Sequence, residues 1–187
     1  VTALEAIAAH GGKLNDAQFA VAATALSAPD PSPKLGQRAA RALSHLTLTP
    51  PRDRQCNTLL DLIRSSTPMT LGFLLKPFER LDPGTWPTRE FDSLGVALAE
   101  ALQSAPGLKS LRAEQLAALS RPFSATYPQA HRAFSRLAGD QAGNAAERAQ
   151  RLDDLLAVTG KGNASRGRAL FHANRSTCSQ CHAIGNR

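Results

Sequence analysis

The chain has 187 residues, a formal net charge of +7 and a pI of about 10.0. Hydrophobic residues make up 42% of it but aromatic residues only 5%, and the apolar content is mostly alanine and leucine, which favour helices over strands. This composition argues against β-rich folds, and the sequence has no run of about 18 apolar residues that could span a bilayer. We therefore expect an all-α protein.

Apolar residues recur at helical spacing in successive segments, and each set predicts one stripe of an amphipathic helix. In chain order the stripes lie at 19–26, 35–46, 56–63, 91–102, 127–137 and 149–156. Breakers separate them, among them Pro50-Pro51, Pro83-Gly84, Pro106-Gly107 and the stretch from Gly139 to Gly143. Because short connections make successive helices antiparallel neighbours, we expect a HEAT-like α-solenoid, with an irregular helical bundle as the alternative.

The last stripe predicts a helix at about 144–158, and two glycines in the following residues, Gly160 and Gly162, indicate a helix stop and a linker. We expect a helical repeat domain at 1–159, a linker at 160–163 and a second domain at 164–187 that opens with a short helix, 164–173. From Leu155 onward the sequence has no Asp or Glu, so this tail is basic. Because the chain begins with Val1 and not Met, we expect a processed product or a fragment.

The second domain contains Cys178, Cys181 and His182 in the order Cys-x-x-Cys-His, which allows three chemical interpretations. A c-type haem site uses all three residues: both sulfurs bind haem vinyl groups, and the histidine is the proximal iron ligand. A thioredoxin-like pair would follow a strand, and no strand pattern precedes this motif. A zinc site would need a second ligand cluster, which the other histidines do not form by their spacing. Chance would produce the pattern in about one such sequence in a thousand.

The residues before the motif also favour haem, since Gly167, Leu170 and Phe171 lie on a helix that leads into it, as in class I cytochromes c. Helical repeats followed by GKGNASRGRALFHANRSTCSQCHAIG resemble the haem-binding domain found in Planctomycetes and Verrucomicrobia, where HEAT-like repeats lead into a small cytochrome c module. The resemblance is specific over 160–185 and architectural before that. It implies electron transfer through haem c on Cys178 and Cys181, with His182 bound to the iron.

The resemblance also implies a redox partner or a dehydrogenase-like domain, in the periplasm or cell envelope, because haem c is attached outside the cytoplasm. The family's distal methionine and closing helix do not follow the motif here, so we expect a C-terminally truncated cytochrome module without that sixth ligand. We expect its opening helix either to dock back onto 144–158 or to stay mobile. Nothing in the sequence resembles a catalytic constellation.

A different class of function would suit the same chain. A basic helical-repeat module could bind an acidic protein or nucleic acid, with the cysteines incidental, although we expect no nucleic-acid partner if haem is bound. Among the remaining residues, we expect Cys56 to be a buried hydrophobe, Trp86 to fold onto the helices and His131 to be a core histidine. His172 is a weaker candidate for a second axial ligand.

Overall fold

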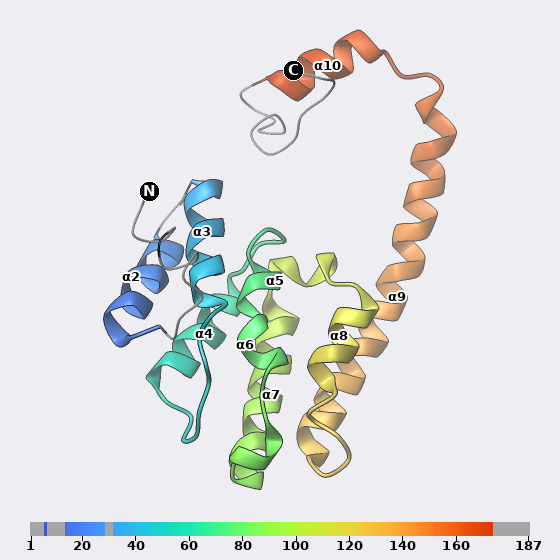
Figure 1. The fold of residues 1–187 in the computed structure, drawn as a ribbon. Coiled ribbons are helices and arrows are strands. Elements are labelled where there is room, and N and C mark those ends of the chain that lie inside the picture. The colour runs from blue at the N-terminus through green and yellow to red at the C-terminus, as the bar shows by residue number, and fades with distance from the viewer. Residues whose placement is uncertain (1–5, 7–13, 29–31, 174–187) are drawn as a thin grey trace. The chain divides into compact units, whose positions relative to one another are not determined.

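The computed structural model describes Ala6 and residues 14–28 and 32–173, and every element within these ranges is helical (Figure 1). This confirms the predicted all-α class. The chain divides into two compact units, Val1–Asn144 and Ala145–Arg187, which are described separately below. None of the described helices is both long and apolar enough to span a membrane.

The first unit consists of short helices joined by tight turns. Its elements are α2 (Asp16–Ser27), α3 (Pro33–Leu43), α4 (Arg54–Arg64), α5 (Leu71–Leu74), α6 (Lys76–Glu79), η1 (Pro83–Thr85), α7 (Thr88–Ser104), η2 (Pro106–Ser110), α8 (Ala113–Ser120) and the beginning of α9 (Pro128–Thr159). The second unit contains the rest of α9 and α10 (Ala164–His172). The predicted stripes fall on α2, α3, α4, α7 and α9, whereas the shorter α5, α6 and α8 were not predicted.

Polar side chains fix where the early helices begin. Asn15 and Gln18 form a capping box at α2, in which each side-chain oxygen accepts the backbone N–H of the other residue, at 2.9 and 3.0 Å. The Asp53 carboxylate accepts the N–H of Cys56 at 2.8 Å at the start of α4. Such caps satisfy N–H groups that have no partner inside the helix, and each contributes about 1 kcal/mol.

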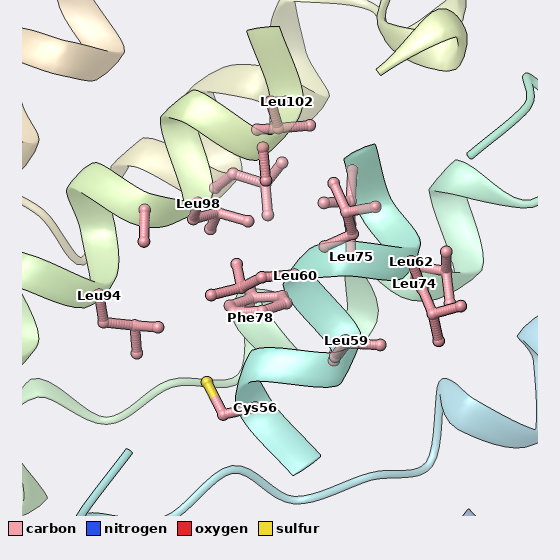
Figure 2. Close-up of a cluster of buried hydrophobic side chains, with 14 of the residues drawn as sticks. Cys56, Leu59, Leu60, Leu62, Leu74, Leu75, Phe78, Leu94, Leu98 and Leu102 are labelled. Atoms are coloured by element: carbon pink, nitrogen blue, oxygen red, sulfur yellow. The ribbon is translucent and has the colours of Figure 1, made fainter. Parts of the chain in front are cut away.

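The centre of the first unit is a layer of leucines between α4 and α7, with Phe78 of α6 beside it (Figure 2). Cys56 and Leu60 point from α4 toward Leu94, Leu98 and Leu102 of α7, whereas Leu59 extends from the other side of α4. All six side chains are at most 1% exposed. These residues are the predicted stripes of 56–63 and 91–102, so the expectation that Cys56 is buried is confirmed.

Small residues are buried on α2 and α3, the two helices before this layer. Ala22 on α2 and Ala39, Ala40 and Ala42 on α3 are completely buried, and the two helices pack against each other. Short side chains allow two helices to approach each other closely. The atoms of the helices then make the dispersion contacts that larger side chains make elsewhere in the core.

The beginning of α9 is fixed against α7 by a close approach at Gly95. A Cβ atom at Gly95 would lie 2.4 Å from the Cβ of Ala130 and 2.5 Å from Cδ1 of Phe123, so only glycine fits there. Aromatic rings surround this crossing, with centroids 4.7 Å apart for Phe91 and Phe123 and 5.3 Å apart for Phe123 and Phe134. The ring of Tyr127 lies 4.8 Å from that of Phe91.

Trp86 adds to the same cluster, with its ring centroid 6.2 Å from that of Phe91. Its side chain is 6% exposed, which confirms the expectation that it folds onto the helices. Because aromatic pairs add stability beyond their buried area, the cluster holds α7 and the start of α9 together.

Two sequence expectations about α9 are wrong. The stretch from Gly139 to Gly143 does not break the helix, which continues from Pro128 to Thr159. Both glycines have open space around the position of a Cβ atom, and a glycine at an exposed helical position costs only about 1 kcal/mol relative to alanine. His131 is exposed and not a core residue, because it lies at the edge of the stripe formed by Ala130, Phe134 and Leu137.

Candidate functional site

The three residues of the predicted haem site, Cys178, Cys181 and His182, lie outside the described residues. The described part of the second unit ends at Ala173, five residues before the first of these cysteines. What the structure gives is the helix that leads into the motif and the helix before it.

The helix that leads into the motif is α10, and its beginning is set by Asn163. The side-chain Oδ1 of Asn163 accepts the N–H of Arg166 at 2.9 Å, and its carbonyl accepts the N–H of Gly167 at 2.9 Å. The helix ends where the N–H of Ala173 reaches the carbonyl of Leu170 at 3.2 Å. The expected short helix at 164–173 is therefore present, one residue shorter at its end.

Residues 160–163 join α9 to α10. The N–H groups of Lys161 and Gly162 donate to the carbonyls of Val158 and Thr159, both at 3.0 Å, and so close the last turn of α9. The first compact unit ends earlier, inside α9 at Asn144. That 160–163 is the linker between two domains stays a prediction.

The apolar side chains at the end of α9 are exposed. Leu152, Leu155, Leu156 and Val158 are 52 to 58% exposed, and Leu170 of α10 is 59% exposed. The expectation that 149–156 forms a buried stripe is therefore wrong, and so is the alternative in which α10 docks on this stripe. The periodicity was correctly read as helical, but an apolar face is buried only where a second element covers it.

His172 is the described histidine nearest to the motif. It is exposed, and its ring meets that of Phe171 edge to face with the centroids 5.1 Å apart. Phe171 itself is half-buried. His45 is half-buried and His131 exposed, and no group of three or more His, Cys, Asp or Glu side chains in the described part of the chain could hold a metal ion.

Cys56 is the one free cysteine among the described residues, and it is buried. Burial raises the pKa of its thiol from 9.0 to about 11; nearby Arg52 opposes the shift, and Asp53 adds to it. Because the thiolate is the nucleophile and the metal ligand, the raised pKa disfavours redox chemistry and metal binding at this cysteine at neutral pH.

A hollow between α7 and α9 in the first unit is a further candidate for a binding site. Its polar rim carries Arg132 and Arg136 from α9, opposite Glu100, and Asp140 lies one turn further along α9. Two positive and two negative side chains leave no net charge to select an anion or a cation. The hollow therefore does not identify a ligand.

Sequence reasoning missed Asp92, whose carboxylate lies buried at the first turn of α9. Its Oδ1 accepts the N–H of Ala130 at 2.7 Å, and its Oδ2 lies 3.4 Å from the N of Gln129. An acidic residue within the apolar pattern of 91–102 indicates that a hydrogen-bond donor pairs with it in the core. The partner could not be identified, because it lies 38 residues further along the chain.

Comparison of the chain with protein-family models, curated protein sequences and solved structures finds no match.

Proposed function

We propose that this chain transfers electrons through a c-type haem bound covalently at Cys178 and Cys181, with His182 as the proximal ligand of the iron. The observation that carries the proposal is the sequence Cys178-Ser-Gln-Cys181-His182. Electron transfer of this kind needs no catalytic constellation in the chain itself.

The chemistry of these side chains fits haem. Each cysteine thiol adds across one vinyl group: a sulfur–carbon bond forms, and the thiol proton passes to the other vinyl carbon, so that no oxidant is needed. A spacing of two residues lets both sulfurs serve one porphyrin, and the adjacent His182 supplies an imidazole nitrogen. The bound haem would supply a one-electron change at iron.

Support also comes from what surrounds the motif. A capped helix, α10, leads into it. Cys56 is buried in the core of the first unit, so two of the three cysteines of the chain remain for the haem. A thiol-redox pair would follow a strand, and every described element is a helix.

The first unit would then be a scaffold of HEAT-like type that holds the haem module against a redox partner or a dehydrogenase-like domain. Helical repeats offer extended surfaces and little chemistry of their own. Covalent haem attachment takes place outside the cytoplasm, so we place the protein in the periplasm or cell envelope.

The test is expression of the 187-residue chain together with a haem-attachment system. We expect a red protein whose haem stays on the chain after denaturation and whose reduced form has a sharp absorption band. The matched control is Cys56→Ala, which should keep the haem, whereas Cys178→Ala with Cys181→Ala should lose it. A colourless wild-type protein that binds polyanions in a salt-sensitive way would overturn the proposal in favour of a basic interaction module.

A further inference from the structure

The segment from Arg148 to Ala173, which comprises the end of α9 and all of α10, combines exposed aliphatic side chains with positive charge. Leu152, Leu155, Leu156 and Leu170 are each more than half exposed. Single exposed leucines are ordinary on protein surfaces, but several at helical spacing on one helix are not. We call residues 148–173 the apolar–basic segment.

The exposed leucines of α9 lie on one side of the helix. At about 100° per residue, Leu152, Leu155 and Leu156 fall within one arc of about 100°. Arg151 borders this arc on one side and Asp153 on the other, while Asp154 lies on the opposite face of the helix. The charges beside the arc therefore balance on α9, and the leucines supply the apolar face that helices in a membrane interface present to the acyl chains.

Positive charge continues through the linker and α10. The apolar–basic segment has five basic residues and two acidic ones, and no acidic residue follows Asp154. Lys161, Arg166 and Arg168 are all exposed. Such residues attract an anionic surface, while their long aliphatic stems accompany the leucines into the interface.

We propose that the apolar–basic segment binds the surface of a membrane that contains anionic lipids. The leucines would enter the boundary between headgroups and acyl chains, and the basic residues would pair with lipid phosphates. This inference does not rest on haem binding at 178–182. The segment would lie on the membrane surface and would not cross the bilayer.

A lipid surface fits these observations better than a protein partner does. Four half-exposed aliphatic side chains offer roughly 400 Å² of apolar surface, about half of what one partner contributes to a standard protein interface. Of the three residue types that most often anchor protein interfaces, the segment has arginine but neither Trp nor Tyr. Interfacial membrane binding has no such minimum area, because electrostatic attraction adds to the buried apolar area.

The experiment is sedimentation of the 187-residue chain with vesicles, using the haem-free variant Cys178→Ser with Cys181→Ser. The protein should co-sediment with vesicles of phosphatidylcholine that contain about one third phosphatidylglycerol, but not with vesicles of pure phosphatidylcholine. Salt at about 0.5 M should weaken the binding. Because haem is absent, failure of this test is distinct from failure of the electron-transfer proposal.

Substitution of the leucines tests the apolar contribution. The triple variant Leu152→Gln, Leu155→Gln and Leu156→Gln should weaken vesicle binding at least about tenfold. The matched control places glutamines at Ala146 and Ala157, exposed residues on the other side of α9, and should bind as the unsubstituted chain does. All five positions are exposed, so circular dichroism should show the same helix content in both variants.

Substitution of arginines tests the charge. Arg166→Gln with Arg168→Gln should weaken binding about tenfold or more, since each basic residue near an anionic surface contributes roughly fivefold. The control, Arg89→Gln with Arg121→Gln, removes the same charge from exposed positions of the first unit and should change binding far less.

Three results would overturn the proposal. One is absence of binding to the anionic vesicles at low salt. Another is equal binding to neutral and anionic vesicles. The third is a concentration-dependent dimer in analytical ultracentrifugation that the leucine triple variant abolishes, while vesicle binding stays unchanged. A second copy of the chain would then cover the leucines.

Discussion

The carboxylate of Asp92 on α7 accepts a hydrogen bond from the backbone N–H of Ala130 in the first turn of α9, with 2.7 Å between Oδ1 and N. Tyr127, the residue immediately before α9, has no side-chain acceptor suited to capping these N–H groups. A carboxylate from a different helix therefore does what an N-cap residue normally does. The negative charge also lies where the helix dipole favours it.

Loss of this carboxylate should destabilise the first unit. We expect Asp92→Ala to lower the free energy of unfolding by about 2 kcal/mol, because buried N–H groups lose a charged acceptor. Asp92→Asn keeps an oxygen acceptor and should cost less. Urea denaturation followed by circular dichroism measures both, and Asp140→Ala, at an exposed position of α9, is the control that should change little.

Two glycines should respond to alanine with opposite sign. Gly95→Ala places a Cβ atom 2.4 Å from the Cβ of Ala130, so α7 and α9 must separate, and we expect a loss of about 1–3 kcal/mol. Gly139→Ala meets no neighbouring atom and should gain up to about 1 kcal/mol, because alanine favours the helix. Equal effects of the two substitutions in urea unfolding would show that the α7–α9 crossing is looser than described.

Cys56 should label only when the protein unfolds. In the variant Cys178→Ser with Cys181→Ser, a thiol reagent at pH 8 should react slowly with the folded chain and fast in denaturant, since the side chain is 1% exposed and burial raises its pKa. Fast labelling of the native protein would contradict this.

The same thiol should make stability depend on pH at the alkaline end. Its pKa is raised on folding, so its contribution is fully present below pH 9.0 and is lost as the pH rises toward about 11, because only the unfolded chain ionises there. Relative to Cys56→Ala, the free energy of unfolding should fall by about 2–3 kcal/mol across this window. A constant difference between the two proteins from pH 8 to 11 would refute the assignment.

Removal of the cysteines of the motif should leave the first unit intact. We expect Cys178→Ala with Cys181→Ala to keep the cooperative thermal unfolding of the haem-free chain, because the buried residues of α2 to α8 lie in the other compact unit. Circular dichroism during heating measures it. Loss of cooperativity would place the end of the chain within the core.

The sequence predicted those parts of the fold that depend on local pattern. The stripes of α4 and α7 and the burial of Cys56 follow from helical periodicity, which needs only neighbouring residues. The break expected between Gly139 and Gly143 was wrong, since glycine weakens a helix without ending it when no turn is required. The pairing of Asp92 with Ala130 could not be predicted from the sequence, because it depends on how α7 and α9 pack against each other.

The candidate site, too, was predicted from the sequence only where it depends on local pattern. The helix that leads into the motif was predicted from its pattern, and the structure contains it as α10. Exposure of Leu152, Leu155 and Leu156 could not be predicted, since their spacing is that of any amphipathic helix and burial depends on the presence of a covering element. The haem assignment for Cys178, Cys181 and His182 stays a prediction.

The buried alanines of α2 and α3 determine how this part of the chain can change during evolution. Ala22, Ala39 and Ala40 have no exposed surface, so a larger side chain at these positions must displace its neighbours, and we expect size to restrict them more than polarity does. Serine or glycine would be tolerated there more readily than valine or leucine, the reverse of the usual order in a leucine-rich core. At these alanines we therefore expect substitution to be limited to the smallest residues, and a gain of hydrophobicity that adds volume to destabilise the first unit.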